Sequence, residues 1–144
     1  YKDMTSRVEE AVKRHKSGYN CAQAVVCTYC DLLGTQEKDA FCMSEGFGAG
    51  MGGKENTCGA LSGAVMLTGL KSSDGNLEAP KSKGRTYKLS REITERFQQM
   101  CGATVCKELK GIETGAPKYS CPDCVRAAAQ IAEEVLFGEE HEQV

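Results

Sequence analysis

The chain contains no tryptophan, only three prolines and two histidines in 144 residues, and no uncharged apolar run long enough to cross a bilayer. The longest such run extends from Asn56 to Leu70 and is interrupted by glycines. His15 and His141 stand among charged residues, so we expect both at the surface, which disfavours mixed cysteine–histidine metal sites. The net charge of −2 gives no general attraction to nucleic acid. The sequence therefore predicts neither a membrane-spanning nor a nucleic-acid-binding protein.

The opening residues, "YKDMTSRVEE", lack the apolar segment of an export signal. A cytoplasmic location is therefore expected, unless a signal has been removed before residue 1. Cysteine is the abundant exception in this composition, with nine residues. An odd number cannot pair completely within one chain, and a chain of this length needs no disulfides to fold. Free thiols, metal ligands or catalytic redox groups are therefore expected in preference to structural disulfides.

The spacing of apolar residues is helical throughout, and no alternating β-branched run occurs. The sequence predicts an all-α fold, a compact bundle of five or six helices in a single domain spanning residues 1–144. Polar residues followed by helical patterns predict four helix N-caps, two of them capping boxes completed by Gln23 and Asp123. These N-caps are Asn20, Thr57, Thr104 and Ser120.

Cysteines recur at the predicted helix starts. Cys21, Cys58 and Cys106 each follow an N-cap within two residues, and Cys124 lies in the first turn of the last helix, with Cys121 beside it. A helix start offers unpaired N–H groups and a positive dipole end, and both favour a thiolate. We therefore expect these sulfurs, although distant along the chain, to converge in one polar pocket.

Glycines surround Cys58. Gly59 leaves space beside the sulfur for a cofactor or for another backbone, so it is a candidate cofactor-binding residue. Gly63 lies one turn later on the same helix face, and close helix packing explains this glycine pair equally well. Cys27 and Cys30 fall within an apolar helical stretch and are expected to be buried.

The ordered set of "NCAQAV", "GFGAGMGG" followed by "CGALSG", "CKELKG" and "CVRAAA" resembles the C_GCAxxG_C_C family of small, helical, redox-active proteins, mostly bacterial or archaeal. The resemblance implies that Cys21, Cys58, Cys106 and Cys124 are the four motif cysteines, with Cys121 as a substitute for Cys124. A related domain in the split-Soret cytochromes resembles an iron–sulfur site. Four further cysteines lie outside the family pattern: Cys27, Cys30, Cys42 and Cys101.

Three functions remain open at this point. In the first, the four motif cysteines bind a [2Fe–2S] cluster or a single metal ion and exchange electrons with a redox partner protein. In the second, no metal is involved: Cys58 is the reactive thiol, and one of the other three motif cysteines resolves the disulfide. In the third, the protein is a structural helical domain without a redox role, whose apolar helix 58–70 supplies the face of a homodimer. Whether the protein is an enzyme stays undecided.

Overall fold

The computed structural model describes residues 5–138, which form seven α-helices and no strand. The prediction of an all-α fold is confirmed, with seven α-helices in place of five or six because the short α3 and α6 are separate elements. His141 lies outside the described residues. The α-helices are α1 (Val8–Lys16), α2 (Cys21–Tyr29), α3 (Glu37–Ser44), α4 (Gly59–Ser72), α5 (Lys83–Cys101), α6 (Cys106–Lys110) and α7 (Cys121–Leu136). Two 3₁₀ turns, η1 (Cys30–Leu33) and η2 (Glu45–Phe47), and a π-type turn, η3 (Gly50–Lys54), complete the described part.

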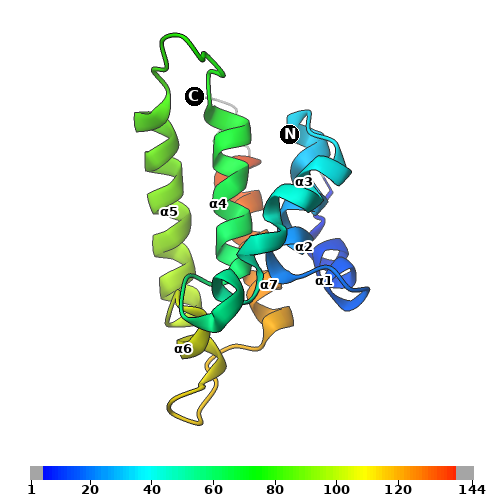
Figure 1. Ribbon diagram of the computed structural model, residues 1–144, viewed down its shortest axis with the longest axis vertical. Coiled ribbons are helices and arrows are strands. Elements are labelled where there is room, and N and C mark those ends of the chain that lie inside the picture. The colour runs from blue at the N-terminus through cyan, green and yellow to red at the C-terminus, as the bar shows by residue number, and fades with distance from the viewer. Residues whose placement is uncertain (1–4, 139–144) are drawn as a thin grey trace.

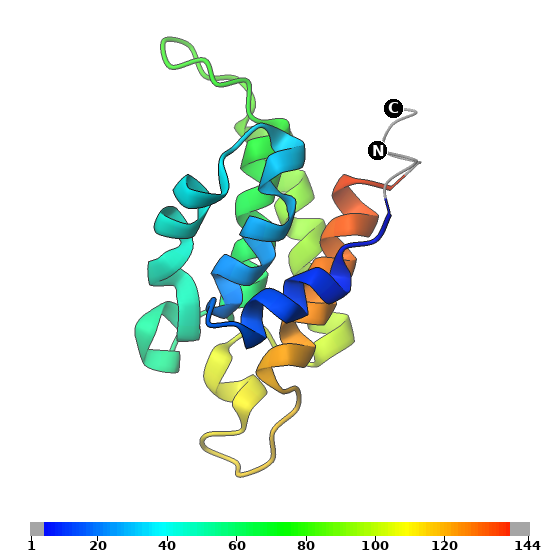
Figure 2. The ribbon, with the colours of Figure 1, turned by 90° about the vertical axis from the view of Figure 1, so that its right-hand side faces the viewer.

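Helix α4 is the central element of the bundle. It packs against α2, α5 and α7, while α1 lies on α2 and α7, and α3 lies on α2 (Figure 1 and Figure 2). Leu61 and Leu67 are fully buried in these contacts, whereas Leu70 near the end of α4 is 40% exposed. Packing within the bundle thus uses much of the apolar run, and its predicted role as a dimer face stays a prediction. None of the described helices combines the length and apolarity needed to cross a membrane.

Two of the four predicted N-caps are confirmed. The side chain of Asn20 accepts a hydrogen bond from the Gln23 backbone N–H, and the Gln23 side chain accepts one from the Asn20 N–H, which completes the capping box. Ser120 caps α7 by accepting from the Asp123 N–H, whereas the reciprocal bond from the Asp123 side chain is not formed. The starts of α2 and α7 are thus fixed by local sequence signals.

The other two N-cap predictions are wrong. Helix α4 has Cys58 as its N-cap and α6 has Val105, each one residue later than predicted. Thr57 and Val105 form an isolated antiparallel bridge, which holds both residues in extended backbone. The Cys58 N–H donates to the Thr104 carbonyl at 2.7 Å, and the Cys106 N–H donates to the Asn56 carbonyl at 2.9 Å. This pairing joins the starts of α4 and α6 and brings their cysteines to the same end of the bundle.

The glycine pair of α4 allows a close approach to α2. A Cβ atom on Gly63 would lie 2.7 Å from the Ala22 carbonyl oxygen, and one on Gly59 would lie 2.9 Å from the Phe47 carbonyl oxygen. Real Cβ atoms do not come so near to backbone oxygens, so the helices would have to separate. Close packing therefore accounts for Gly63, whereas Gly59 both packs against backbone and lines the cysteine pocket described below, so its predicted role beside a cofactor stays a prediction.

Replacing Gly63 with alanine is expected to lower the free energy of unfolding by about 1–3 kcal/mol, because the new methyl group overpacks the contact with α2. Gly69→Ala is the matched control, since Gly69 lies on the same helix with no atom within 4 Å of an added Cβ. That variant should match the parent or gain up to about 1 kcal/mol. Urea unfolding at constant m-value measures the free energy of unfolding of both variants. Equal stability of Gly63→Ala and Gly69→Ala would contradict the close contact between Gly63 and α2.

Candidate functional site

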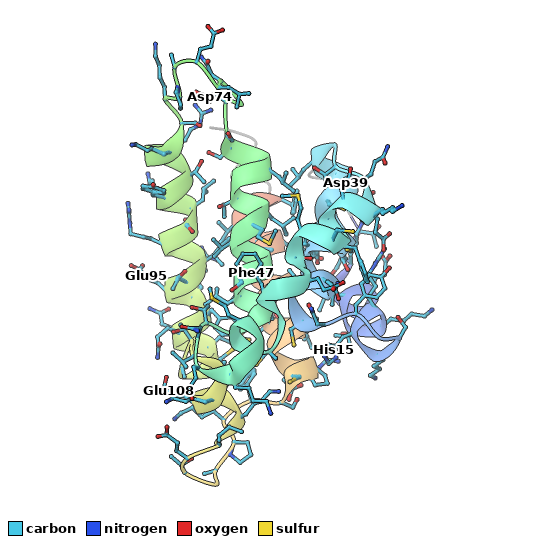
Figure 3. The ribbon with its side chains drawn as sticks, viewed as in Figure 1. His15, Asp39, Phe47, Asp74, Glu95 and Glu108 are labelled. Atoms are coloured by element: carbon cyan, nitrogen blue, oxygen red, sulfur yellow. The ribbon has the colours of Figure 1, made fainter. Side chains whose placement is uncertain are left out.

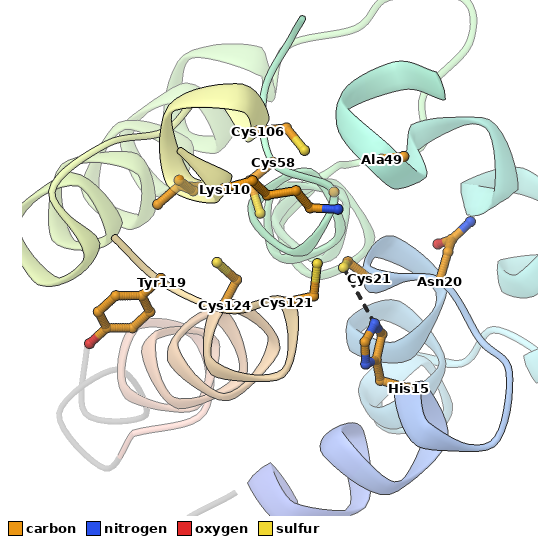
Figure 4. Close-up of a pocket in the computed structure, with 12 residues that line it drawn as sticks. His15, Asn20, Cys21, Ala49, Cys58, Cys106, Lys110, Tyr119, Cys121 and Cys124 are labelled. Carbon is orange, nitrogen blue, oxygen red and sulfur yellow. Dashed lines mark hydrogen bonds between the residues drawn. The ribbon is translucent and has the colours of Figure 1, made fainter. Parts of the chain in front are cut away.

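One pocket gathers five of the nine cysteines. Its cavity of about 190 Å³ opens at one end of the bundle (Figure 4). Histidine, lysine and tyrosine side chains from α1, α6 and the chain before α7 also line it. The lining cysteines are Cys21, Cys58, Cys106, Cys121 and Cys124. The four cysteines predicted from the motif thus border a single pocket, together with the one named as a substitute.

Helix starts position these sulfurs. Cys21, Cys106 and Cys121 are the first residues of α2, α6 and α7, and Cys58 is the N-cap of α4. Cys124 lies one turn into α7. The pocket therefore lies at the end of the bundle where the N-termini of four helices meet, while Asp74 in the loop between α4 and α5 lies at the far end (Figure 3).

Cys21 and Cys121 form the first of two thiol pairs, which we call the outer pair because both side chains are half-buried. The hydrogen bond between them raises the pKa of the Cys21 thiol and lowers that of Cys121 to about 5. Lys110 also donates to the Cys121 sulfur and lowers its pKa further. Within this pair, Cys121 is therefore the member favoured as the thiolate.

Cys58 and Cys124 form the second pair, which we call the inner pair because the two residues are only 5% and 3% exposed. Their hydrogen bond lowers the pKa of Cys58 to about 7 and raises that of Cys124. The Cys58 sulfur makes no close capping hydrogen bond, yet the N–H groups of Ala60 and Leu61 at the start of α4 act on it and favour its thiolate. Here Cys124 donates and Cys58 accepts.

A helix start does not lower the pKa of every cysteine, contrary to expectation. The pKa of Cys106 is raised, mainly because burial disfavours its charged form, and those of Cys21 and Cys124 are raised because each is the donor of its pair. Pairing and burial thus outweigh the helix dipole at these three positions.

Sequence reasoning missed the histidine, lysine and tyrosine side chains of the pocket, His15, Lys110 and Tyr119. The His15 Nε2 lies 3.7 Å from the Cys21 sulfur and borders the pocket, so the expectation of a surface histidine apart from the cysteines is wrong (Figure 4). Lys110 reaches over the pocket, where burial lowers its pKa, but its interactions with Cys121 and the neighbouring sulfurs raise it by more. Lys110 follows Cys106 by four residues, a helical spacing that could have indicated their shared face.

The remaining four cysteines lie elsewhere. Cys27 and Cys30 are buried in a separate apolar cluster with Val26 and Ala40, as predicted, and Cys42 is exposed on α3. Cys101 is buried at the end of α5, where its charge state is coupled to those of the inner pair. None of the nine cysteines, all within residues 5–138, is in a disulfide.

Gly50 and Ala49 bring the turn before α4 over the pocket. Ala49 has a φ of 53°, a left-handed conformation uncommon outside glycine, and lines the pocket. A Cβ on Gly50 would lie 2.6 Å from the Cβ of Cys106. This close contact holds the turn against the start of α6 and so limits the opening of the pocket.

Five thiols and an imidazole are, in kind, the donors that zinc and iron–sulfur clusters take. Their arrangement is less favourable: within residues 5–138, no three or more histidine, cysteine, aspartate or glutamate side chains are grouped so as to hold a metal ion. Four of the five sulfurs instead belong to the outer and inner pairs, and Cys106 belongs to neither.

The fold and the pocket together define a small all-α protein with a cysteine-lined site at converging helix N-termini. Residues 19–135 match the model of the family described as "Putative redox-active protein (C_GCAxxG_C_C)". The chain therefore belongs to the C_GCAxxG_C_C family, as the motif resemblance indicated. No curated protein and no solved structure gives a significant match.

Proposed function

We propose that this protein performs thiol–disulfide exchange, with the outer and inner pairs cycling between dithiol and disulfide. The observation that carries the proposal is the gathering of Cys21, Cys58, Cys121 and Cys124 in one pocket (Figure 4), and the mutual pKa shifts of Cys21 with Cys121 and of Cys58 with Cys124 are consistent with two adjacent pairs. A disulfide needs two sulfurs that can approach to bonding distance without backbone movement. In each pair, one member is also favoured as the thiolate, which is the attacking form.

The outer pair supplies the first reaction. The Cys121 thiolate attacks one sulfur of a substrate disulfide, forms a mixed disulfide and releases the other half as a thiolate. Cys21 then gives up its proton and attacks the Cys121 sulfur, which closes the Cys21–Cys121 disulfide and releases the second half. Two electrons pass from the protein to the substrate. Cys58, the attacker expected from the sequence, is the member of the inner pair that is favoured as the thiolate.

Titration of the purified protein between reduced and oxidised dithiothreitol tests the proposal. Peptide mapping of the oxidised protein should identify two disulfides, Cys21–Cys121 and Cys58–Cys124, each with a measurable reduction potential. The Cys58→Ser variant should lose only the inner one, and Cys27→Ser, in the separate cluster, should keep both. An oxidised protein without these two disulfides would contradict the proposal.

Ligation of a [2Fe–2S] cluster or a single metal ion is the second candidate. It is favoured by the match between two sulfur pairs and a cluster that takes four cysteine ligands, two for each iron. Cys21, Cys58, Cys121 and Cys124 would hold it, with Cys106 as a further thiol at the pocket. A bound cluster would supply one-electron transfer.

Absorbance of anaerobically purified protein separates the two candidates. A band in the region of about 400–450 nm that is lost on chelation and absent from Cys58→Ser supports the cluster. A colourless protein with two dithiol potentials supports thiol exchange. Both candidates require a redox partner protein or small thiol that restores the reduced state, and a reducing compartment such as the cytoplasm would do so for nine free thiols.

A further inference from the structure

The two thiol pairs differ in their accessibility to molecules outside the protein. The outer sulfurs of Cys21 and Cys121 are half-buried, whereas Cys58 and Cys124 are 5% and 3% exposed. A cavity of about 190 Å³ admits only a small molecule. An external disulfide can therefore be attacked from the outer pair, while the inner pair lacks direct access to it.

The pairs nevertheless adjoin each other. Cys121 and Cys124 are three residues apart on α7 and so face the same side of the helix. The charge of Cys121 acts on Cys58, and that of Cys21 acts on Cys124. Figure 4 shows all four side chains directed into the same pocket. The shared pocket therefore places the two pairs side by side, as sulfur-to-sulfur exchange between them requires.

We propose that the two pairs form an internal relay, in which a small external disulfide oxidises the outer pair and the outer pair passes its disulfide to the inner pair. The relay rests on the proposed thiol exchange and adds the order in which the two pairs are oxidised. The inner pair is the store, and the outer pair is the only route by which it is oxidised.

The disulfide passes from the outer pair to the inner pair in two balanced steps. The Cys58 thiolate attacks the Cys121 sulfur of the outer disulfide, forms a Cys58–Cys121 disulfide and releases the Cys21 thiolate, which takes up a proton. Cys124 then loses its proton and attacks Cys58, which closes the Cys58–Cys124 disulfide and releases the Cys121 thiolate. The outer pair is again a dithiol and can reduce a second external disulfide. One chain therefore delivers four electrons in total, two to each external disulfide.

Reaction of the fully reduced protein with hydroxyethyl disulfide, followed by acid quenching and peptide mapping over time, tests the relay. In the parent protein, the Cys21–Cys121 disulfide should appear first, at a rate proportional to the reagent concentration. The Cys58–Cys124 disulfide should follow at a rate independent of that concentration. Appearance of the inner disulfide before the outer one would overturn the relay, and this measurement needs no variant.

Two variants sharpen the test. In the double variant Cys21→Ser/Cys121→Ser, which lacks the outer pair, the inner disulfide should form at about one tenth of the parent rate or more slowly. In Cys124→Ser, the Cys58–Cys121 disulfide should accumulate, because its resolving thiol is missing. Cys27→Ser should follow the parent kinetics.

Inner oxidation at the parent rate in the double variant would show two independent pairs, which overturns the relay and leaves thiol exchange standing. Failure of both disulfides to form in the parent would overturn the proposed function itself.

Discussion

In the Cys21→Ala variant, the pKa of the Cys121 thiol is expected to rise by about two units, because the thiolate loses the S–H donor that stabilises it most. The sign follows from the pairing: a donor to the charged form lowers a thiol pKa, so its removal raises it. In the parent, Cys21 and Lys110 lower the pKa of Cys121 to about 5. The midpoint of the pH profile for alkylation of Cys121, followed by mass spectrometry of its peptide, measures the change.

Two lysines of α6 provide the controls for this experiment. Lys110→Met removes a second donor to the Cys121 sulfur and should raise the midpoint by a smaller amount, about one unit. Lys107→Met removes the same charge from the same helix, but Lys107 pairs with Glu55 and Glu113 instead. This variant should leave the midpoint unchanged. An unaltered midpoint in Cys21→Ala would show that the outer pair does not share a proton.

The Glu133→Ala variant is expected to lose about 2–3 kcal/mol of unfolding free energy, since it leaves buried donors without an acceptor. The Glu133 carboxylate accepts from the Tyr29 hydroxyl at 2.5 Å and from the Arg7 backbone N–H at 2.7 Å, and more distantly from the Ser6 hydroxyl. Tyr29 is fully buried, and burial together with this hydrogen bond raises its pKa. One side chain of α7 thus ties the start of α1 to the end of α2.

The neighbouring Glu134 is the matched control for that measurement. It is largely exposed and pairs with Arg96 at 3.3 Å, so Glu134→Ala should change the stability by less than about 0.5 kcal/mol. Glu133→Gln, which keeps one acceptor oxygen, should fall between the two alanine variants. Urea unfolding midpoints at constant m-value rank all three. Equal midpoints for Glu133→Ala and Glu134→Ala would show that the buried hydroxyl finds another partner.

Local signals in the sequence predict most of the fold. Helical periodicity indicates the α-helices, and Asn20 and Ser120 mark two of their starts because an N-cap needs only the next three residues. The errors at Thr57 and Thr104 have a non-local cause: the bridge between Thr57 and Val105 joins segments far apart in the chain, and each helix starts after it. Tertiary pairing here overrides a capping signal.

The candidate site is predictable in its membership and less so in its chemistry. Spacing places cysteines at helix starts and so selects the lining of the pocket, but it does not say which sulfur lies next to which. The sequence pattern predicts Cys121 only as a substitute for Cys124. In the structure, Cys121 interacts with Cys21, whereas Cys124 interacts with Cys58. Lys110 lowers the pKa of Cys121 because α6 is oriented toward the start of α7. Helical periodicity in the sequence does not predict that orientation.

The contact of Gly59 and Gly63 with α2 also sets a distance between sulfurs. Gly59 adjoins the Ala22 backbone, one residue after Cys21, and is itself next to Cys58. The interhelical gap at this crossing therefore fixes how far the outer pair stands from the inner pair. A bulkier residue at either glycine would widen that gap. Under the proposed relay, an alanine at either glycine should therefore slow exchange between the pairs as well as destabilise the crossing of α4 with α2.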